Sequence, residues 1–256
     1  MSQQIDASAL PPAWILAGGL GTRLKSVLAD RPKALAPVAG RPFLDILFDQ
    51  LLCLGFTECV LLLGVRHESI LEFLAHRQLQ RKGLPDLRVL TSIERSPLGT
   101  GGAIQHARSH ATGPFFVLNG DTYVDFDARS MLQRHKQCSA LLTIAVVQQP
   151  DTRRYGSVEV AADGTVCGFR EKAAGSGPGF INAGVYLMQP ELLDYISNAG
   201  AVSLEQTVLP SLVRAGKRIC AVEQFGEFFD IGTPDSLIAF ESRCTEVEPR
   251  RLEETS

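Results

Sequence analysis

The sequence lacks the features of a membrane, secreted or nucleic-acid-binding protein. Its longest apolar runs, such as residues 141–147, are far shorter than the roughly 20 residues that a helix needs to cross a bilayer. The first 12 residues have neither the basic patch nor the apolar block of a secretory signal. A formal net charge of -3 provides no basic field for nucleic acid or an anionic membrane surface. We therefore expect a cytoplasmic protein whose partners are neither nucleic acids nor membranes.

Metal-binding patterns of cysteine and histidine are also missing. The 6 cysteines form no C-x-x-C pair, and most of them lie inside apolar stretches. This spacing favours reduced core thiols over disulfides or a structural zinc site. His106 and His110 have the separation seen in zinc proteases, but the glutamate that should follow the first histidine is absent. We expect them to be surface histidines on a helix.

The order of apolar segments predicts the fold class. The 256 residues are 45% hydrophobic and 21% charged, as in a globular protein with a sizeable core. Up to residue 138, strand-like runs alternate with helical spacing, which indicates a parallel sheet with crossover helices. Residues 140–188 contain three strand-like runs with a turn at Asp163-Gly164, which predicts an antiparallel insert. No flexible linker interrupts the chain, so we predict one domain over residues 13–246, with tails at 1–12 and 247–256.

A glycine-rich turn follows the first strand-like run. The segment WILAGGLGTRL places Gly18, Gly19 and Gly21 before Arg23. Bare backbone N–H groups at such a turn can surround phosphate oxygens. The segment misses both the Walker A pattern and the dinucleotide fingerprint by one residue, and a plain strand-to-helix connection is the competing interpretation. Lys33 lies ten residues beyond Arg23, so one segment can bring two cations to one polyphosphate.

Two aspartates are candidate ligands for a magnesium ion. Asp121 follows the apolar run FFVLNG, and Asp230 follows an aromatic run in EFFDIGTP. Carboxylates at the carboxyl end of a sheet lie where ligands of open α/β folds bind. Mg²⁺ needs only one or two protein carboxylates beside water and substrate phosphates. Either aspartate alone is more commonly a turn or helix cap.

The segments LAGGLGTRL and RPKALAPVAGRPF together resemble the signature of the sugar-1-phosphate nucleotidyltransferases, and the likeness extends over roughly residues 14–241. The resemblance implies a three-layer α/β/α Rossmann-like nucleotide-diphospho-sugar transferase fold, with a mixed, mostly parallel sheet and a small antiparallel sugar-binding insert. It implies catalytic roles for Arg23, Lys33 and Asp121, and it assigns Mg²⁺ to Asp121 and Asp230. The nucleotide-binding residues that it implies are Leu16, Ala17, Gly18, Gly19, Gly21, Thr22, Glu94, Gly99 and Thr100.

The same resemblance implies that Glu94 selects the nucleotide base. In the family, a second glycine turn lies against the base, and the residue three before its proline reads the base edge. A carboxylate at Glu94 accepts two hydrogen bonds from guanine, whereas uracil or thymine offers one donor. GTP is therefore the favoured nucleotide. Without the resemblance, the turn at Gly99 is also consistent with a plain helix start.

The resemblance places the sugar phosphate in the strand-rich insert, where the matching residues are Gly156, Glu171, Lys172, Asn182 and Gly184. From the residues alone, Glu171 and Lys172 form an ordinary surface pair, and Gly184 keeps a strand slim. We assign Glu205 to a helix start and expect Arg153 to be solvated, with a phosphate contact as the competing interpretation.

These assignments predict an enzyme that transfers a nucleotidyl group, GMP from GTP, to a sugar 1-phosphate and releases pyrophosphate. The segments PLGTGG and VLNGDTYVDFD resemble the branch that acts on D-glycero-D-manno-heptose 1-phosphate, whose products feed cell-surface polysaccharides. Mannose-1-phosphate guanylyltransferases and N-acetylmuramate-1-phosphate uridylyltransferases are the competing branches. A non-catalytic nucleotide-sugar sensor is the competing class, and the sequence leaves a homodimer open.

Overall fold

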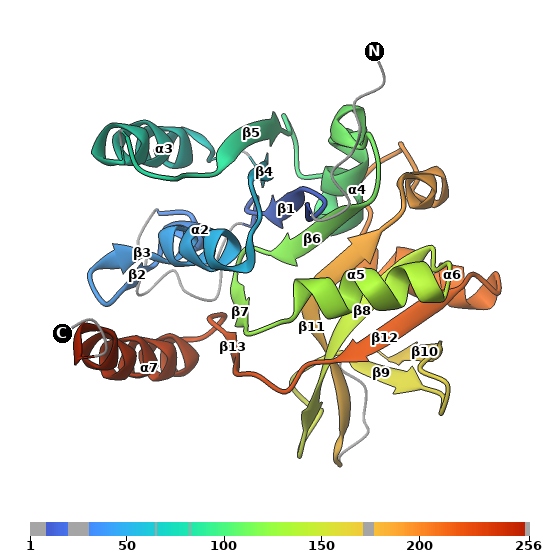
Figure 1. Cartoon of the computed structure of the whole chain (residues 1–256). Coiled ribbons are helices and arrows are strands. Elements are labelled where there is room, and N and C mark those ends of the chain that lie inside the picture. Colours follow the sequence, from blue (N-terminus) through green and yellow to red (C-terminus); the bar gives the residue numbers. More distant parts are fainter. Residues whose placement is uncertain (1–8, 20–30, 65, 82, 171–176, 254–256) are drawn as a thin grey trace.

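A nine-stranded mixed sheet runs through the protein, with helices on both of its faces (Figure 1). The computed structural model describes residues 9–19, 31–64, 66–81, 83–170 and 177–253. The strands of this sheet are β1 (Ala13–Leu16), β4 (Glu58–Leu63), β5 (Arg88–Ile93), β6 (Phe115–Asn119), β8 (Leu142–Gln149), β9 (Ser157–Val160), β10 (Val166–Arg170), β11 (Gly179–Met188) and β12 (Ile219–Glu223). Their order is β10-β9-β11-β6-β1-β4-β5, and β8 pairs with β11 and β12.

The longer helices are α2 (Phe43–Leu54), α3 (Glu68–Gln80), α4 (Gly99–His106), α5 (Ala128–Gln137), α6 (Leu209–Arg214) and α7 (Pro234–Glu253). Short 3₁₀ turns occupy Lys33–Leu35, Arg108–His110 and Pro190–Tyr195. Two small ribbons complete the fold: β2 (Pro37–Val38) pairs with β3 (Arg41–Pro42), and β7 (Thr122–Val124) pairs with β13 (Phe228–Asp230). Helix α7 lies beside β2 and β13 (Figure 1).

The parallel part of the sheet sets the position of the functional residues. β1 pairs in parallel with both β4 and β6, and β4 pairs in parallel with β5. The carboxyl ends of these four strands therefore meet at one edge, where Gly18, Gly64, Glu94 and Asp121 follow them in the chain. This edge is where the crevice of an open α/β sheet forms.

Alternate side chains of each strand pack into one of two apolar layers. In β1, Ile15 belongs to the layer that contains Phe43 and Leu47 of α2. Its neighbour Trp14 points to the other layer, with Ile104 of α4, and stacks on Phe115 with ring centroids 4.0 Å apart. Because strand side chains alternate between faces, one strand contributes to both layers. The predicted three-layer α/β/α architecture is confirmed.

The strand-rich segment forms the predicted antiparallel insert. β9 and β10 pair antiparallel around the turn at Gly164, whose φ of 82° is the left-handed conformation that glycine adopts readily. β11 joins this insert to the core, because it pairs with β9 near its start and with β6 near its end. Its register with β8 shifts between Asn182 and Tyr186.

Two expected helices differ from the observed elements. The segment expected to be helical at 191–197 is the 3₁₀ turn Pro190–Tyr195, and the one expected at 204–215 begins as a π-type turn, Leu204–Val208, before α6. Pro210 has no N–H for an α-helical bond to the preceding turn. Val208 N donates to Ser203 O, five residues earlier, at 3.2 Å, whereas in an α-helix the acceptor lies four residues earlier.

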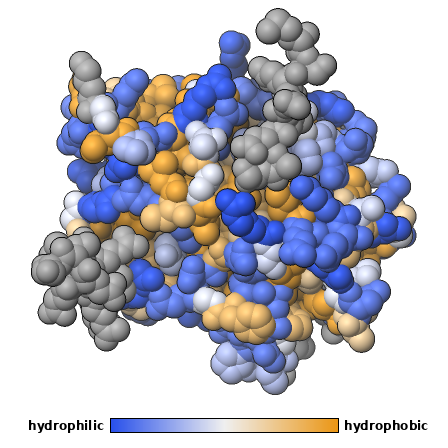
Figure 2. Space-filling model, in the orientation of Figure 1, coloured by the Kyte–Doolittle hydropathy of each residue, from blue (hydrophilic) through white to orange (hydrophobic). Residues whose placement is uncertain are grey.

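Hydrophilic side chains surround areas of hydrophobic surface on the face seen in Figure 2. Within the described part of the chain, no helix is both long and apolar enough to cross a membrane. All 6 cysteines are free, as expected, but only Cys59 and Cys220 are buried in the core, and Cys53 and Cys167 are exposed.

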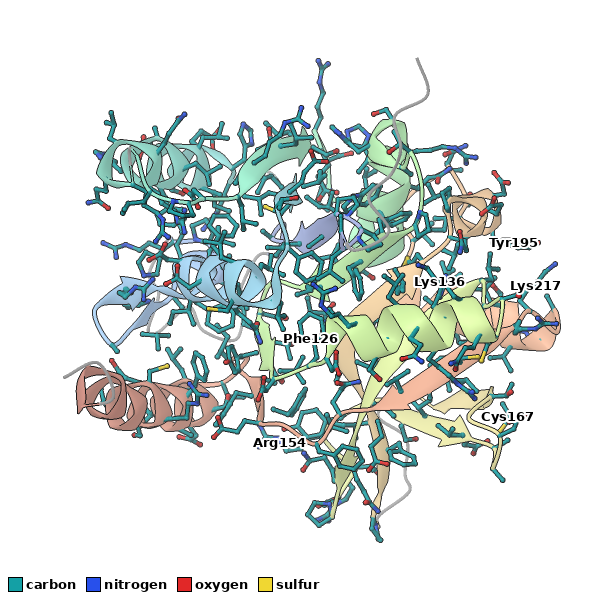
Figure 3. All side chains as sticks on the ribbon, viewed as in Figure 1. Phe126, Lys136, Arg154, Cys167, Tyr195 and Lys217 are labelled. Carbon is teal, nitrogen blue, oxygen red and sulfur yellow. The ribbon has the colours of Figure 1, made fainter. Side chains whose placement is uncertain are left out.

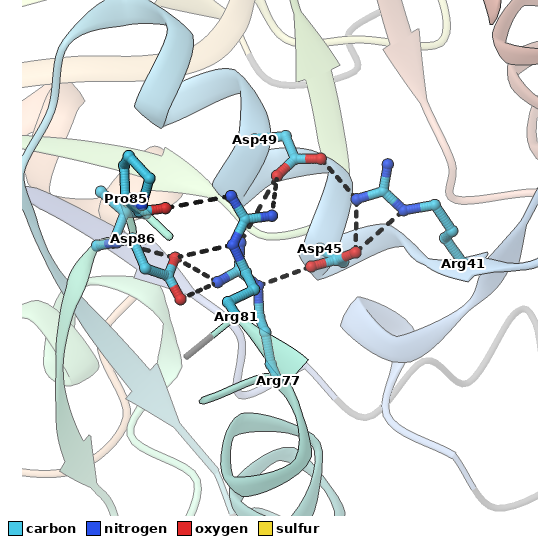
Figure 4. A network of polar contacts seen from close by, with 8 residues as sticks. Arg41, Asp45, Asp49, Arg77, Arg81, Pro85 and Asp86 are labelled. Carbon is cyan, nitrogen blue, oxygen red and sulfur yellow. Dashed lines mark hydrogen bonds and ion pairs between the residues drawn. The ribbon is translucent and has the colours of Figure 1, made fainter. Parts of the chain in front are cut away.

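A network of arginines and aspartates ties α2 to α3 and to the β3 segment (Figure 4). Arg77 is almost fully buried, and its Nε donates to Asp45 Oδ1 at 2.7 Å, while its Nη1 pairs with Asp86. Arg41 donates to the same Asp45 and to Asp49. Each buried charge has an opposite partner, which offsets the cost of removing it from water.

His135 of α5 is a buried ionisable group away from the sheet edge. It is 1% exposed, with Nδ1 2.8 Å from Thr143 Oγ1 and Nε2 2.9 Å from Gln189 Nε2. If Nε2 accepts from the glutamine amide, Nδ1–H donates to the threonine, and the ring is neutral. Burial lowers the pKa of His135 to about 4.

This histidine predicts a loss of stability in acid. The unfolded chain takes up a proton near the ordinary pKa of about 6.5, while the folded chain does so only near 4, so unfolding is favoured as the pH falls between these values. We expect the free energy of unfolding to fall by about 3 kcal/mol across this window from His135 alone. Urea unfolding of His135→Gln should lose that part of the pH dependence. An unchanged pH profile in the variant would contradict a buried neutral imidazole.

Candidate functional site

A cavity of about 670 Å³ lies at the carboxyl edge of the parallel strands. Most of the predicted site residues that the structure describes line it: Leu16, Ala17, Gly18, Gly19, Lys33, Glu94, Gly99, Thr100, Asp121, Gly156, Asn182 and Asp230. These residues come from segments spread over more than two hundred positions of the chain, and the sheet topology brings them together.

The other six predicted residues fall into two groups. Gly21, Thr22, Arg23, Glu171 and Lys172 lie outside the described residues. Gly184 is described but does not line the cavity. Its φ is +74°, and a Cβ there would lie 2.7 Å from Asn119 Nδ2, so close packing and backbone conformation account for this glycine.

Lys33 joins the two predicted metal ligands. Its Nζ lies 2.5 Å from Asp121 Oδ2 and 3.9 Å from Asp230 Oδ1. The lysine side chain is 14% exposed, whereas the side chains of Asp121 and Asp230 are 42% and 30% exposed. One ammonium group therefore offsets part of the negative charge of a carboxylate pair that faces the cavity.

The small ribbon of β7 and β13 fixes the distance between these aspartates. Asp230 is the last residue of β13 and pairs with Thr122, which follows Asp121 directly. Ile231 N donates to Asp121 O at 3.0 Å, and Gly232 N donates to Asp230 Oδ1 at 2.8 Å. Backbone hydrogen bonds thus hold both carboxylates at the same end of the ribbon.

The donor set of this cluster fits a hard divalent cation. Both carboxylates already share the positive charge of Lys33, and both are reached from the cavity. Among the described residues, no group of three or more His, Cys, Asp or Glu side chains gathers in a metal-binding arrangement. Mg²⁺ typically retains water and takes one or two carboxylates plus substrate phosphates. Asp121 and Asp230 therefore suit a metal that arrives with a phosphate ligand.

One wall of the cavity is built from the glycine turn and Glu94. A Cβ on Gly18 would lie 3.0 Å from Gly64 N and 3.6 Å from Glu94 Oε1, so the bare backbone lets these segments approach closely. Glu94 is 8% exposed, and its Oε2 accepts a 3.3 Å hydrogen bond from Leu98 N. Burial raises the pKa of Glu94, while the Leu98 amide opposes that rise.

The second glycine turn is held against residues 202–205. Gly99 has φ +72°, and a Cβ there would lie 2.5 Å from Val202 O. Thr100 accepts a hydrogen bond from Leu204 N at 2.8 Å and donates to Glu205 Oε2 at 2.7 Å. Glu205 also lines the cavity. Its contact with Thr100 is additional to the helix-start role that the sequence predicts.

The opposite wall comes from the insert and β11. Gly156 O accepts a hydrogen bond from Asn182 N at 3.1 Å, which places both residues together on the cavity. The Asn182 Nδ2 group donates to the Tyr186 hydroxyl at 2.6 Å. Burial first, and then the nearby Glu205 carboxylate, raises the pKa of Tyr186 well above its ordinary value. The buried phenol therefore remains protonated and serves as the acceptor for the Asn182 amide.

Sequence reasoning missed several residues that line the cavity. These are Pro97, Ala103, Asn119, Thr122, Arg154, Tyr155, Ser157, Phe169, Glu205, Leu209, Phe228 and Gly232, together with Ala34 and Gly120. For the apolar members, the sequence gives no signal beyond hydrophobicity. Asn119 and Thr122 flank Asp121, so their position beside a candidate ligand was an available signal.

The Tyr186 hydroxyl should contribute measurably to stability. Tyr186→Phe leaves the Asn182 amide without its acceptor. We expect the free energy of unfolding in urea to fall by about 1–3 kcal/mol. Tyr195→Phe is the matched control, because Tyr195 is 42% exposed, and its change should stay within about 0.5 kcal/mol. Equal losses in the two variants would contradict a stabilising hydrogen bond between Asn182 and Tyr186.

Comparisons with known proteins agree with this geometry. The model of the nucleotidyl transferase family matches residues 13–246. D-glycero-alpha-D-manno-heptose 1-phosphate guanylyltransferase of Campylobacter jejuni is 34% identical over 228 residues, which cover 89% of this chain and 97% of that protein. The protein of the same name in Aneurinibacillus thermoaerophilus is 36% identical over 87% of this chain and 94% of its own length. HddC of Yersinia pseudotuberculosis, solved in complex with GMP-PN, has a TM-score of 0.77 at 32% identity and covers 91% of this chain and 99% of that one. The chain belongs to the nucleotidyl transferase family.

Proposed function

We propose that this protein transfers GMP from GTP to D-glycero-α-D-manno-heptose 1-phosphate and releases pyrophosphate. The observation that carries the proposal is the cluster of Lys33, Asp121 and Asp230, which faces the cavity. The nucleotide wall of this cavity is formed by the two glycine turns and Glu94, and the insert wall opposite is formed by the insert and β11. The names of the two bacterial relatives, which align along almost their whole length, support the substrate. The guanine nucleotide analogue in HddC supports the base.

The chemistry requires no covalent enzyme intermediate. A phosphate oxygen of the sugar 1-phosphate attacks the α-phosphorus of GTP, and the bond from that phosphorus to the α–β bridging oxygen breaks. Pyrophosphate leaves with the electron pair. The nucleophile is already an anion, so the residues of the chain contribute by aligning two anions and offsetting their repulsion.

Lys33 supplies positive charge at the reacting end of the cavity, next to both aspartates. In the bound state, Asp121 and Asp230 would hold Mg²⁺, which neutralises phosphate charge. Lys33, beside both carboxylates, would donate to a phosphate oxygen at this end of the cavity. Arg23 and Lys172, assigned by family resemblance, would add charge from outside the described residues.

Glu94 gives the cavity its preference for guanine. Its carboxylate is buried on the nucleotide wall, and Oε1 faces the Gly18 backbone without the Leu98 contact that Oε2 makes. Guanine offers N1–H and N2–H donors to such a group, and a pyrimidine offers one donor. Gly156 and Asn182 hold the sugar, whose hydroxyls can bond to backbone and amide groups there.

The direct test is pyrophosphate release with Mg²⁺ and a matrix of nucleotides and sugar phosphates. GTP with D-glycero-α-D-manno-heptose 1-phosphate should give the highest kcat/KM, above UTP and above mannose or N-acetylmuramate 1-phosphate. Binding without pyrophosphate release for every pair would instead support a nucleotide-sugar sensor. Faster turnover of another pair would correct the substrate.

The variant Glu94→Gln tests base selection in the same assay. Glutamine offers only one acceptor and places an amide donor opposite the donors of guanine. The ratio of kcat/KM for GTP over UTP should fall by roughly tenfold or more, since a bidentate base contact contributes about 1–3 kcal/mol. An unaltered ratio would remove Glu94 from base recognition.

A further inference from the structure

The described wall of the cavity carries more negative than positive charge. Four of its residues are acidic: Glu94, Asp121, Glu205 and Asp230. Two are cationic, Lys33 and Arg154, and Lys33 is already paired with the two aspartates. An entering phosphate monoester therefore meets a carboxylate-rich surface, and a cation without a carboxylate partner has the greatest effect on its binding.

Arg154 is that cation. Its side chain lies near the end of the insert and β13 (Figure 3), with the guanidinium carbon 5.9 Å from the ring centroid of Tyr155. Tyr155 in turn packs edge-on against Phe228 of β13, with centroids 5.4 Å apart. Within the described part of the chain, Arg154 has no hydrogen bond or ion pair to a carboxylate. An arginine that rests on an aromatic ring keeps its planar set of N–H donors available.

The neighbouring Arg153 is exposed, as Arg154 is, but it differs from Arg154 in its partner and in its position relative to the cavity. Its guanidinium pairs with Asp151, with Nη2 2.6 Å from Oδ2, and its side chain is 67% exposed. It does not line the cavity, which agrees with the solvated position expected from the sequence. Of these two adjacent arginines, Arg153 thus forms a surface ion pair and Arg154 lines the cavity.

We infer that Arg154 binds the phosphate group of the sugar 1-phosphate and is a substrate-binding residue of the site. This inference rests on the proposed function. The guanidinium fork matches phosphate oxygens and donates two parallel hydrogen bonds. Arg154 immediately precedes Tyr155 and Gly156, so it belongs to the insert wall rather than to the glycine turn and Glu94.

The position of Tyr155 relates this arginine to the reacting end. Arg154 lies over the Tyr155 ring, which packs against Phe228, two residues before Asp230 in β13. Burial raises the pKa of Tyr155, the Arg154 charge lowers it and the Asp230 charge raises it, which agrees with this geometry. A phosphate held by Arg154 on the insert wall is then close to the end of the cavity where Asp230 and Lys33 meet. That is where the attacking phosphate oxygen has to lie in the proposed reaction.

The test compares Arg154→Ala with the matched control Arg153→Ala, which removes the same charge from the adjacent position. In steady-state assays, Arg154→Ala should raise KM for heptose 1-phosphate by roughly ten- to a hundredfold and leave KM for GTP within about twofold. Arg154→Lys should recover part of the loss, because it restores the charge without the fork. Arg153→Ala should match the wild type in both constants.

A binding measurement separates this inference from the proposed activity. Calorimetric titration of heptose 1-phosphate into enzyme with a non-hydrolysable GTP analogue should show the same loss of affinity in Arg154→Ala, whether or not turnover occurs. The unphosphorylated heptose should bind wild type and variant equally. A rise in KM for GTP as large as that for the sugar phosphate, or wild-type constants in a folded Arg154→Ala, would overturn the assignment. Absence of turnover in the wild type would overturn only the proposed function.

Discussion

The contact of Lys33 with Asp121 and Asp230 is the interaction on which the site depends. The three residues come from a 3₁₀ turn, from the end of β6 and from the end of β13. They meet because the parallel sheet delivers Asp121 to its carboxyl edge and the β7–β13 ribbon returns the chain to that edge almost two hundred residues after Lys33. The pair of carboxylates keeps a net negative charge beside one ammonium, which favours a divalent cation that arrives with a phosphate.

The two walls of the cavity on either side of this cluster have different compositions. Glycines of the nucleotide wall allow backbone segments to approach within contact distance, and Glu94 is buried among them with a raised pKa. On the insert wall, the Asn182 amide donates to the Tyr186 hydroxyl, and Asn182 N donates to Gly156 O. On the nucleotide wall, Thr100 donates to Glu205 and accepts from Leu204 N. Each wall is therefore ordered by its own polar contacts, which suits a reaction in which alignment of two phosphates supplies much of the rate.

Local patterns of the sequence were sufficient to predict the fold class and to mark the glycine turn, Lys33 and both aspartates as candidates, while the family resemblance assigned their roles. Strand and helix alternation predicts the parallel core, and Asp121 follows from its position after an apolar strand. The family resemblance, rather than the residues alone, pointed to Glu94, Gly156 and Asn182 as site residues. Glu205 and Arg154 were not predicted, because their roles depend on contacts with Thr100, Tyr155 and the cavity that no local spacing encodes. The π-type turn at Leu204–Val208 escaped prediction for a related reason, since apolar periodicity continues through it.

The most direct test of the account is Mg²⁺ binding at the paired aspartates. Calorimetry with a non-hydrolysable GTP analogue should show that Asp121→Asn and Asp230→Asn each weaken Mg²⁺ affinity by roughly tenfold or more. Asp125→Asn, an exposed aspartate four residues from Asp121 that does not line the cavity, should bind as the wild type does. Wild-type affinity in both Asp121→Asn and Asp230→Asn would contradict the claim that these two carboxylates share one cation.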